Sequence, residues 1–370
     1  MTGGDEIALD GGQADGGGQV LRTALSLSLA TGRPFAIAGI RAGRPEPGLG
    51  PQQLESVRAA AALCDAEVEG AEAGSRRLAF RPRRPVRPGA YEFDLGAAGS
   101  TPLMLQALCW PLALAGGRSR LLLRGGTHLR GGPTFHYLAL VFAPAAARLG
   151  FRVDLELRAA GFRPEGGGEM AAEIHPAHAM PPLDLRHRGT LREVEVLAMV
   201  AGEGFAVAEV LAAAALRRLR EIGVAAEATR LPVPARGSAG SHLLLVAHFD
   251  RTRAGCGEIG ERGAAPGLAA EAAVSAFEAL LRGGAALDPH LGDQLLVPAA
   301  LSAAGRVAVP AGLVPSTRYS VQAVTAHLEA AAEVVRRFLD AEVAVLGRVG
   351  QEGEVRVQPP GGRLEVVPLR

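Results

Sequence analysis

Residues 7–31, IALDGGQADGGGQVLRTALSLSLAT, carry the pattern that decides the fold. The apolar stretch over 7–10 predicts a strand, five glycines follow over 11–18, and the apolar residues from Val20 to Leu29 predict a helix over 19–31. Backbone N–H groups at such a helix start can bind an anion, because glycine has no Cβ and the helix end carries partial positive charge. A tight strand-to-helix turn explains the same glycines without a ligand, so both interpretations stay open.

The strand, loop and helix pattern continues along the chain and recurs. Apolar stretches predict strands over 35–40, 66–69, 91–95, 120–124 and 152–156, with helices over 52–63 and 102–115 and a further helix that ends near 149. The glycine-rich loop before a helix recurs after roughly 85 residues, a period too long for a solenoid, which indicates a few packed copies of one α/β unit. We interpret 161–176 as a partial third copy and the region from 293 to 346 as a fourth.

A different rhythm separates these copies. Between 190 and 284 the sequence predicts a strand over 194–201, a helix over 207–222, a strand over 243–249 and a helix over 266–281. We therefore expect a core domain over 1–186 and 285–350 and a smaller α/β domain inserted over 187–284. The glycines and prolines of 351–370 predict a closing hairpin or a loose tail.

The charged residues are balanced in number and include no lysine. The chain has 370 residues, of which 48% are apolar, and its 39 basic residues, all arginine, face 38 acidic ones. The net charge of +1 gives no general basic field for nucleic acid. Without lysine, Schiff-base chemistry, the phosphate-loop lysine of Walker-type ATPases and a lysyl-AMP intermediate are excluded.

The cysteines and the N-terminus predict a cytoplasmic protein. Cys64, Cys109 and Cys256 are far apart and make neither a disulfide framework nor a zinc motif, which is typical of a reducing compartment. Residues 1–7 hold two acidic side chains and no apolar signal-peptide segment. The apolar runs are shorter than a membrane span, so we expect no membrane association.

Polar residues around the glycine-rich loop are candidates for phosphate binding. Arg41 and Arg44 lie three apart in a loop rich in glycine and proline, where two guanidinium groups can fork onto phosphate oxygens, and Arg22 can converge on the same place. Gln52 stands at the following helix start. Asp15 in the loop would repel an anion unless a divalent cation lies between them, whereas as a helix cap it needs no ligand.

His327 stands apart from the other eight histidines in its setting. Thr325 can cap a helix there, and Leu328, Val335 and Phe338 lie on one apolar stripe, which places the imidazole near a helix start at the edge of the core. An imidazole that is partly unprotonated at neutral pH can attack phosphorus. The other interpretation is an ordinary core histidine.

Several further segments join these residues in a fixed order along nearly the whole chain. They are IALDGGQ (7–13), GGGQVLR (16–22), IRAGRPEPGL (40–49) with Gln52, Gly99-Ser100 with Gln106, GGT (125–127), GFRPEGGG (161–168), GDQL (292–295), and His327-Leu328 with VVRRFL (334–339). In this set and order, the chain resembles the RNA 3′-terminal phosphate cyclase family.

The resemblance implies both a fold and a reaction. The fold is α/β (α+β), with repeated βαβαββ units packed as a core domain and a smaller inserted α/β domain. The reaction is the ATP-dependent conversion of an RNA 3′-terminal phosphate to a 2′,3′-cyclic phosphate through a covalent histidine-AMP intermediate, with release of pyrophosphate and AMP. A chain without lysine can run this scheme, because the adenylylated group is an imidazole.

The resemblance also implies roles for individual residues. His327 is the expected nucleophile, Arg22, Arg41 and Arg44 the expected phosphate-binding group, and Asp15 the expected ligand of a divalent metal, Mg²⁺ or Mn²⁺. The expected nucleotide-binding residues are Gln52, Gln106, Pro133, His290, Leu291, Gly292, Asp293 and Gln294.

The chain departs from the family pattern at several of these positions. Asp15 stands where the family usually has glutamate, and His290 where it has an aromatic residue that stacks on adenine. Residues 321–326, upstream of His327, have no close match, so a different gap would place Ser320 at the nucleophile position instead.

Other functions are compatible with parts of the pattern. A non-catalytic cyclase-like protein acting in ribosomal RNA processing would keep the fold, but it would lose the histidine or the arginines that this chain retains. An enolpyruvyl transferase has similar repeated units, but it relies on lysines that this chain lacks.

We expect ATP and RNA with a 3′-phosphate end as partners, and the oligomeric state stays open, with a homodimer as one option. A basic run on a loop over 76–84 and arginines 118, 120 and 124 along another edge are candidates for tracking RNA phosphates. A solvated, arginine-rich surface explains both groups equally well.

Overall fold

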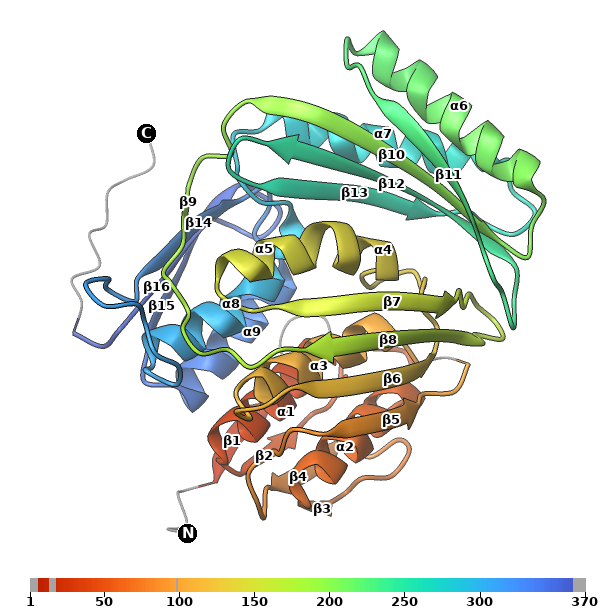
Figure 1. Cartoon of the computed structure of the whole chain (residues 1–370). Helices are drawn as coiled ribbons and strands as arrows, with labels where there is room; N and C mark the ends of the chain where they lie inside the picture. Colours follow the sequence, from red (N-terminus) through yellow and green to blue (C-terminus); the bar gives the residue numbers. More distant parts are fainter. Residues whose placement is uncertain (1–5, 13–17, 98, 362–370) are drawn as a thin grey trace.

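The structure, a computed structural model, describes residues 6–12, 18–97 and 99–361 (Figure 1). Its first unit forms a four-stranded sheet in the order β1-β2-β4-β3, in which β1 and β2 are parallel and β4 is antiparallel to both its neighbours. The elements are β1 (Ile7–Asp10), α1 (Gly18–Thr31), β2 (Phe35–Ala38), α2 (Pro51–Cys64), β3 (Glu67–Glu69) and β4 (Arg77–Arg81).

The second unit repeats this topology. Its sheet has the order β5-β6-β8-β7, with the same parallel first pair and the same antiparallel return. The elements are β5 (Ala90–Asp94), α3 (Thr101–Ala113), β6 (Ser119–Gly125), the consecutive helical segments α4 (Phe135–Tyr137), η1 (Leu138–Phe142) and α5 (Ala143–Arg148), and then β7 (Val153–Ala159) and β8 (Gly168–Ile174).

The third unit has the same strand order but is interrupted. Reading from β9, its sheet runs β9-β14-β16-β15, again with a parallel first pair. The elements are β9 (Asp184–Leu185), then after a long insertion α8 (Pro289–Ala303), β14 (Thr317–Val321), α9 (Ala326–Phe338), β15 (Glu342–Leu346) and β16 (Gly353–Gln358). The C-terminal segment therefore contributes β16, which forms a hairpin with β15.

The number of copies expected from the sequence is wrong. Residues 168–174 form β8, the last strand of the second unit, and the region from 293 belongs to the third unit rather than to a fourth. The third unit opens with a strand of two residues, too short to give a periodic pattern, and the insertion then separates this strand from its helix.

The insertion forms a small α/β layer of its own, within the 187–284 boundaries that we propose. Its sheet order is β11-β10-β12-β13. The elements are β10 (Leu191–Ala201), α6 (Phe205–Glu221), β11 (Glu227–Val233), β12 (Gly240–Phe249), β13 (Arg253–Ile259) and α7 (Pro266–Arg282).

Both faces of this inserted sheet are buried. On β10, Val194, Val196 and Ala198 pack in one apolar cluster with side chains of α6 and α7. Leu197 and Met199, which alternate with them, are buried in the clusters on the opposite face, toward the core domain. Figure 1 shows α6 and α7 on the outer side of the sheet and the segment α4–α5 below its inner side. The insertion is therefore bound to the core by apolar packing.

The helices of the core domain lie between its sheets. Helix α1 is buried over most of its length and packs against α2, α3 and α9, while α8 packs against both α3 and α9. Figure 1 shows these helices gathered at the centre of the core domain. The starts of helices from all three units can therefore contribute side chains to one site.

The arginine groups considered for RNA binding lie elsewhere than expected. Residues 77–81 form β4 rather than a loop, and Arg81 pairs with Glu6 and Glu69. Strand β6, which carries arginines 120 and 124, lies between β5 and β8 rather than at an edge, and both side chains are paired with glutamates of neighbouring strands. Arg81, Arg120 and Arg124 therefore all form ion pairs with glutamates. Among the helices of the described residues, none is long and apolar enough to cross a membrane.

Candidate active site

A cavity of about 540 Å³ opens where the three units and the insertion meet. This volume suits a nucleotide-sized ligand. Seven of the site residues expected from the sequence line it, and they are Arg22, Gln106, Pro133, His290, Asp293, Gln294 and His327.

Helical spacing explains why these side chains converge. Along α1, the residues that line the cavity are Gln19, Arg22, Thr23 and Ser26, which follow the i, i+3, i+4, i+7 spacing of one helix face. Helix α8 lines the cavity at the same spacing, with 290, 293, 294 and 297. Each helix therefore presents one polar stripe to the cavity, while its other faces are buried in the core.

Arg22 places a desolvated positive charge in the cavity wall. Burial lowers the pKa of Arg22 to about 10, and the carboxylate of Asp293 opposes part of that effect. The guanidinium still carries its charge at neutral pH, and it donates a hydrogen bond of 2.5 Å to the Gln19 side chain, which orients it. A charged donor group with little hydration is a strong binding group for phosphate.

Asp293 brings a carboxyl group to the same wall. Burial raises the pKa of Asp293 to about 7, although Thr325 donates a hydrogen bond of 2.6 Å to it, which favours the ionised form. The Thr325 hydroxyl also caps α9 by accepting from the Leu328 N–H at 2.9 Å. Asp293 on α8 is thus linked to the start of the helix that carries His327.

His327 is the second residue of α9 and lines the cavity. His327 is exposed, so a ligand that enters the cavity from solvent can contact it. Ser320, the alternative at this position, lies in β14, where its hydroxyl donates to the Arg186 carbonyl and accepts from the Ala286 N–H. The structure therefore brings His327, and not Ser320, to the cavity.

Two amide side chains in the cavity wall each have one buried polar atom without a hydrogen-bond partner among the described residues. Within the described residues, Gln106 Nε2 and Gln294 Oε1 are buried and make no hydrogen bond. A buried amide group without a partner costs about 1 to 3 kcal/mol, a cost that a polar ligand would remove. The cavity is therefore polar in a way that suits a hydrogen-bonding ligand such as a nucleotide.

The comparisons with known proteins agree with this geometry. The family model for RNA 3′-terminal phosphate cyclase matches residues 13–345. A protein named RNA 3′-terminal phosphate cyclase from Methylococcus capsulatus is 41% identical over 346 residues, covering 92% of each chain. Proteins of the same name are 38% identical in Trichormus variabilis, covering 90% of this chain and 94% of theirs, and 37% identical in Methanopyrus kandleri, covering 96% and 99%.

The chain belongs to the RNA 3′-terminal phosphate cyclase family. As a member of this cyclase family it is an enzyme, and the enolpyruvyl transferase interpretation of its repeated units is set aside.

Not every residue expected in the cyclase site lines the cavity. Leu291 is buried in the core, and Gly292 packs against Val321 and Tyr319, where a Cβ would not fit. Arg41 and Arg44 lie in the loop between β2 and α2, where Arg41 donates to the Gly48 carbonyl at 3.1 Å.

That loop flanks the approach to α1. Ala42 of the loop lies beside Gly12, which follows β1, and Gln53 near the start of α2 lies beside Gly18 at the start of α1. Gln52 is the neighbour of Gln53 on α2. Asp15, the expected metal ligand, lies outside the described residues.

Several residues of the cyclase cavity were missed in the sequence. Thr23 and Ser26 share the polar stripe of α1, and their spacing from Gln19 was a signal that could have found them. Arg130, Glu258 and His242 come from the loop after β6 and from the inserted sheet, and Arg130 pairs with Glu258 at 3.2 Å. No local pattern connects side chains more than a hundred residues apart.

The position of the cavity wall depends on Asp288, a buried carboxylate at the start of α8. Its two oxygens accept from the Tyr137 hydroxyl at 2.7 Å, from the N–H groups of His290 and Leu291 at 3.0 Å, and from the Gly255 N–H at 3.1 Å. One side chain thus joins α4, α8 and β13, which belong to the second unit, the third unit and the insertion.

We expect Asp288→Ala to lower the free energy of unfolding by roughly 3 to 5 kcal/mol, because it leaves four donors, three of them buried, without this acceptor. Urea denaturation of the variant and the wild type measures the change. Asp94→Ala is the matched control, since Asp94 is exposed and accepts one hydrogen bond, from the Gly96 N–H. A loss under 1 kcal/mol for Asp288→Ala would contradict the joining role.

The raised pKa of Asp293 predicts a pH dependence of stability. In the folded state this carboxyl holds its proton up to about pH 7, whereas in the unfolded chain it ionises near its ordinary pKa of 3.8. The proton therefore favours the folded state at low pH, and this contribution is lost as the pH rises toward 7. The side chain of Asp293→Asn does not titrate. Between pH 5 and pH 8 the free energy of unfolding of the wild type should therefore fall by about 2 kcal/mol relative to that of this variant.

Urea denaturation at both pH values tests this expectation. Asp184→Asn is the control, because Arg186 lowers the pKa of Asp184. The Asp184 carboxyl is therefore ionised in both the folded and the unfolded chain from pH 5 to pH 8. The difference in the free energy of unfolding between this variant and the wild type should not change over that range. Parallel stability curves for Asp293→Asn and wild type from pH 5 to pH 8 would show that the Asp293 pKa is not raised.

Proposed function

We propose that this chain converts an RNA 3′-terminal phosphate to a 2′,3′-cyclic phosphate at the expense of ATP, through AMP bound covalently to His327. The relatives named RNA 3′-terminal phosphate cyclase support the overall reaction. The observation that carries the proposal is that His327 lines the same cavity as the desolvated Arg22 guanidinium and as Gln106 and Gln294, each of which has one buried amide atom without a partner among the described residues.

The first step forms the covalent intermediate. An imidazole nitrogen of His327 attacks the α-phosphorus of ATP, an N–P bond forms, and the bond to the bridging oxygen breaks so that pyrophosphate leaves. Arg22 stabilises the negative charge that grows on the phosphate oxygens, because its charge already lies in a poorly hydrated wall. Arg41 and Arg44, on the loop that flanks the start of α1, are proposed to bind the outer phosphates.

The next two steps transfer the AMP and close the ring. An oxygen of the RNA 3′-phosphate attacks the AMP phosphorus and the N–P bond breaks, which returns the electron pair to the imidazole of His327. The adjacent 2′-hydroxyl then attacks the RNA phosphorus, its proton is lost, and AMP leaves with the electrons of the breaking P–O bond. Histidine suits this sequence since it is both a nucleophile and a good leaving group.

The nucleotide is proposed to lie along α8 and α3. Gln106 and Gln294 would bind polar groups of the ligand, and Pro133 and His290 would contact the adenine faces. The His290 ring is exposed at the cavity and its position is fixed by an edge contact with Tyr137, with centroids 6.2 Å apart. Gln52, Leu291 and Gly292 also belong to the proposed nucleotide-binding residues. Leu291 and Gly292 would act by packing in the core, which positions α8.

A divalent ion, Mg²⁺ or Mn²⁺, fits the chemistry of this cavity. Asp293 is a poorly hydrated carboxyl group whose negative charge a cation would stabilise, and it would hold the ion together with Asp15. When bound, the ion supplies positive charge to the triphosphate.

An RNA cyclisation assay tests the proposed function. A 5′-labelled oligonucleotide with a 3′-phosphate is incubated with ATP and Mg²⁺ or Mn²⁺, and the expected product resists phosphatase. The matched control carries a 2′-deoxy sugar at its 3′ end, so it should stop as the adenylylated strand because it has no 2′-hydroxyl. Phosphatase-sensitive ends in both oligonucleotides after incubation would refute the cyclase proposal.

A further inference from the structure

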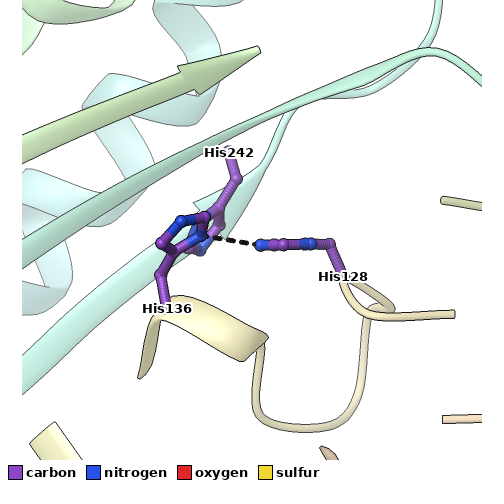
Figure 2. Close-up of side chains that lie close together, drawn as sticks. All are labelled: His128, His136 and His242. Atoms are coloured by element: carbon purple, nitrogen blue, oxygen red, sulfur yellow. Dashed lines mark hydrogen bonds between the residues drawn. The ribbon is translucent and has the colours of Figure 1, made fainter. Parts of the chain in front are cut away.

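Three histidines meet at the boundary between the second unit and the inserted domain. His128 lies in the loop after β6, His136 on α4 and His242 on β12, and Figure 2 shows their rings directed toward one another. All three are buried, with 1%, 6% and 1% of their surface exposed. Among the described residues they form the one group of three or more histidine, cysteine or acidic side chains whose ligand atoms could hold a metal ion.

The nitrogen positions are close to those of a metal site. One nitrogen from each ring lies within 4.8 Å of the other two, and His128 Nε2 lies 2.9 Å from His136 Nδ1. In a tetrahedral zinc site, nitrogens about 2.0 to 2.1 Å from the ion lie about 3.4 Å from one another. To reach that geometry the shortest separation must open by about 0.5 Å, and the longer ones, which are at most 4.8 Å, must close by up to about 1.4 Å.

The surroundings hold the rings in place. The Thr127 hydroxyl lies 2.8 Å from His128 Nδ1, which leaves Nε2 directed at the centre of the group, and the same hydroxyl accepts from the Gly161 N–H. The ring of Phe162 stacks on His128 with centroids 5.2 Å apart. A polar contact to the second ring nitrogen is the usual way in which proteins orient a metal-binding histidine.

Hydrogen bonds among the described residues leave one nitrogen of this group without a partner, because His242 Nε2 lies 3.4 Å from the Thr134 hydroxyl but Nδ1 makes no hydrogen bond. The contact between His128 and His136 uses one nitrogen from each ring, while His242 Nδ1 is buried and has no hydrogen-bond partner in the described part of the chain. Burial lowers the pKa of His136 to about 4 and that of His242 to about 3, so these rings are uncharged at neutral pH. A neutral imidazole is the form that binds a metal.

We propose that His128, His136 and His242 together bind one Zn²⁺ ion, with water as the fourth ligand. Three neutral imidazoles suit this ion. His242 also lines the 540 Å³ cavity, from which water can reach the ion. This site uses other residues than the proposed Mg²⁺ or Mn²⁺ position at Asp293, and it does not depend on the cyclase mechanism. Its expected effect is to fix β12 of the insertion to the loop and helix of the second unit.

Metal analysis of protein purified without a histidine tag tests the proposal. After incubation with ZnCl₂ and gel filtration, wild type should retain one zinc per chain. Competition with a chromophoric chelator should show zinc binding weakened by about 100-fold or more in His128→Ala and in His136→Gln. The glutamine variant keeps a polar side chain next to His128 and is therefore expected to fold. Weaker zinc binding in this variant would then reflect the lost ligand and not misfolding. His178→Ala is the matched control, since His178 is exposed and outside the group.

Two further measurements use the wild type, the second with His136→Gln as its comparison. Co²⁺ in place of zinc should give the visible absorption bands of a four-coordinate site, and zinc should raise the melting temperature of wild type but not of His136→Gln. Less than 0.1 zinc per chain, no cobalt bands, or equal zinc affinity in wild type and His128→Ala would each overturn the proposal.

Discussion

Replacing His327 by alanine is expected to lower the rate of RNA cyclisation by about 10⁴-fold or more, because the proposed bond to AMP forms on its imidazole nitrogen. His327→Gln should be equally inactive, since an amide has the size and polarity of the ring but cannot form the N–P bond. Single-turnover cyclisation of the 3′-phosphate oligonucleotide measures the loss.

The loss should arise without unfolding. His327 is exposed, so its replacement should change the free energy of unfolding by no more than about 0.5 kcal/mol. The control is His187→Ala, an exposed histidine between β9 and β10 that should keep full activity. Activity of His327→Ala within tenfold of wild type would remove His327 from the mechanism.

Arg22 should have the second largest effect. We expect Arg22→Gln to lower kcat/KM for ATP by about 10³-fold, because the variant removes the charge proposed to stabilise the adenylyl group during transfer. Arg22→Lys should lose about 10- to 100-fold, since lysine keeps the charge but not the planar fork that contacts two oxygens. Initial rates of cyclisation at varied ATP concentrations give these values.

The pattern of losses separates catalysis from folding. Arg58→Gln is the control, because Arg58 is an exposed residue of α2 that pairs with Glu55. If Arg22 acted only through stability, Arg22→Lys and Arg22→Gln would lose activity in proportion to their melting temperatures. Equal kcat/KM in Arg22→Gln and wild type would contradict phosphate binding by this residue.

The sequence was sufficient to predict most strands and helices of the core because their apolar patterns are local. The prediction over 7–10 and 19–31 corresponds to β1 and α1, and the helix predicted over 102–115 corresponds to α3. The predicted number of repeated units was wrong because of β9. A strand of two residues has no periodic pattern, and 103 residues separate Leu185 from Pro289, the first residue of α8. The strand order that all three units share could not be predicted from the sequence and was seen only in the structure.

In the candidate site too, some residues could be predicted from the sequence and others could not. Motif order along the chain placed His327, Arg22 and the α8 residues, since these lie in segments that the family resemblance covers. The contributions of the insertion, including His242, could not be predicted, because a strand residue gives no signal of which loop it will meet across the domain boundary. The convergence of His128, His136 and His242 is likewise a property of the tertiary fold.

The measurement that tests the central claim most directly is covalent labelling with ATP carrying a radioactive α-phosphate, in the presence of Mg²⁺ or Mn²⁺ and without RNA. The account predicts label on the wild-type chain that is acid-labile and alkali-stable, as expected for a phosphoramidate, and no label on His327→Ala. A folded wild type that binds ATP but takes up no label would contradict the histidine-AMP intermediate and favour a non-catalytic role in ribosomal RNA processing.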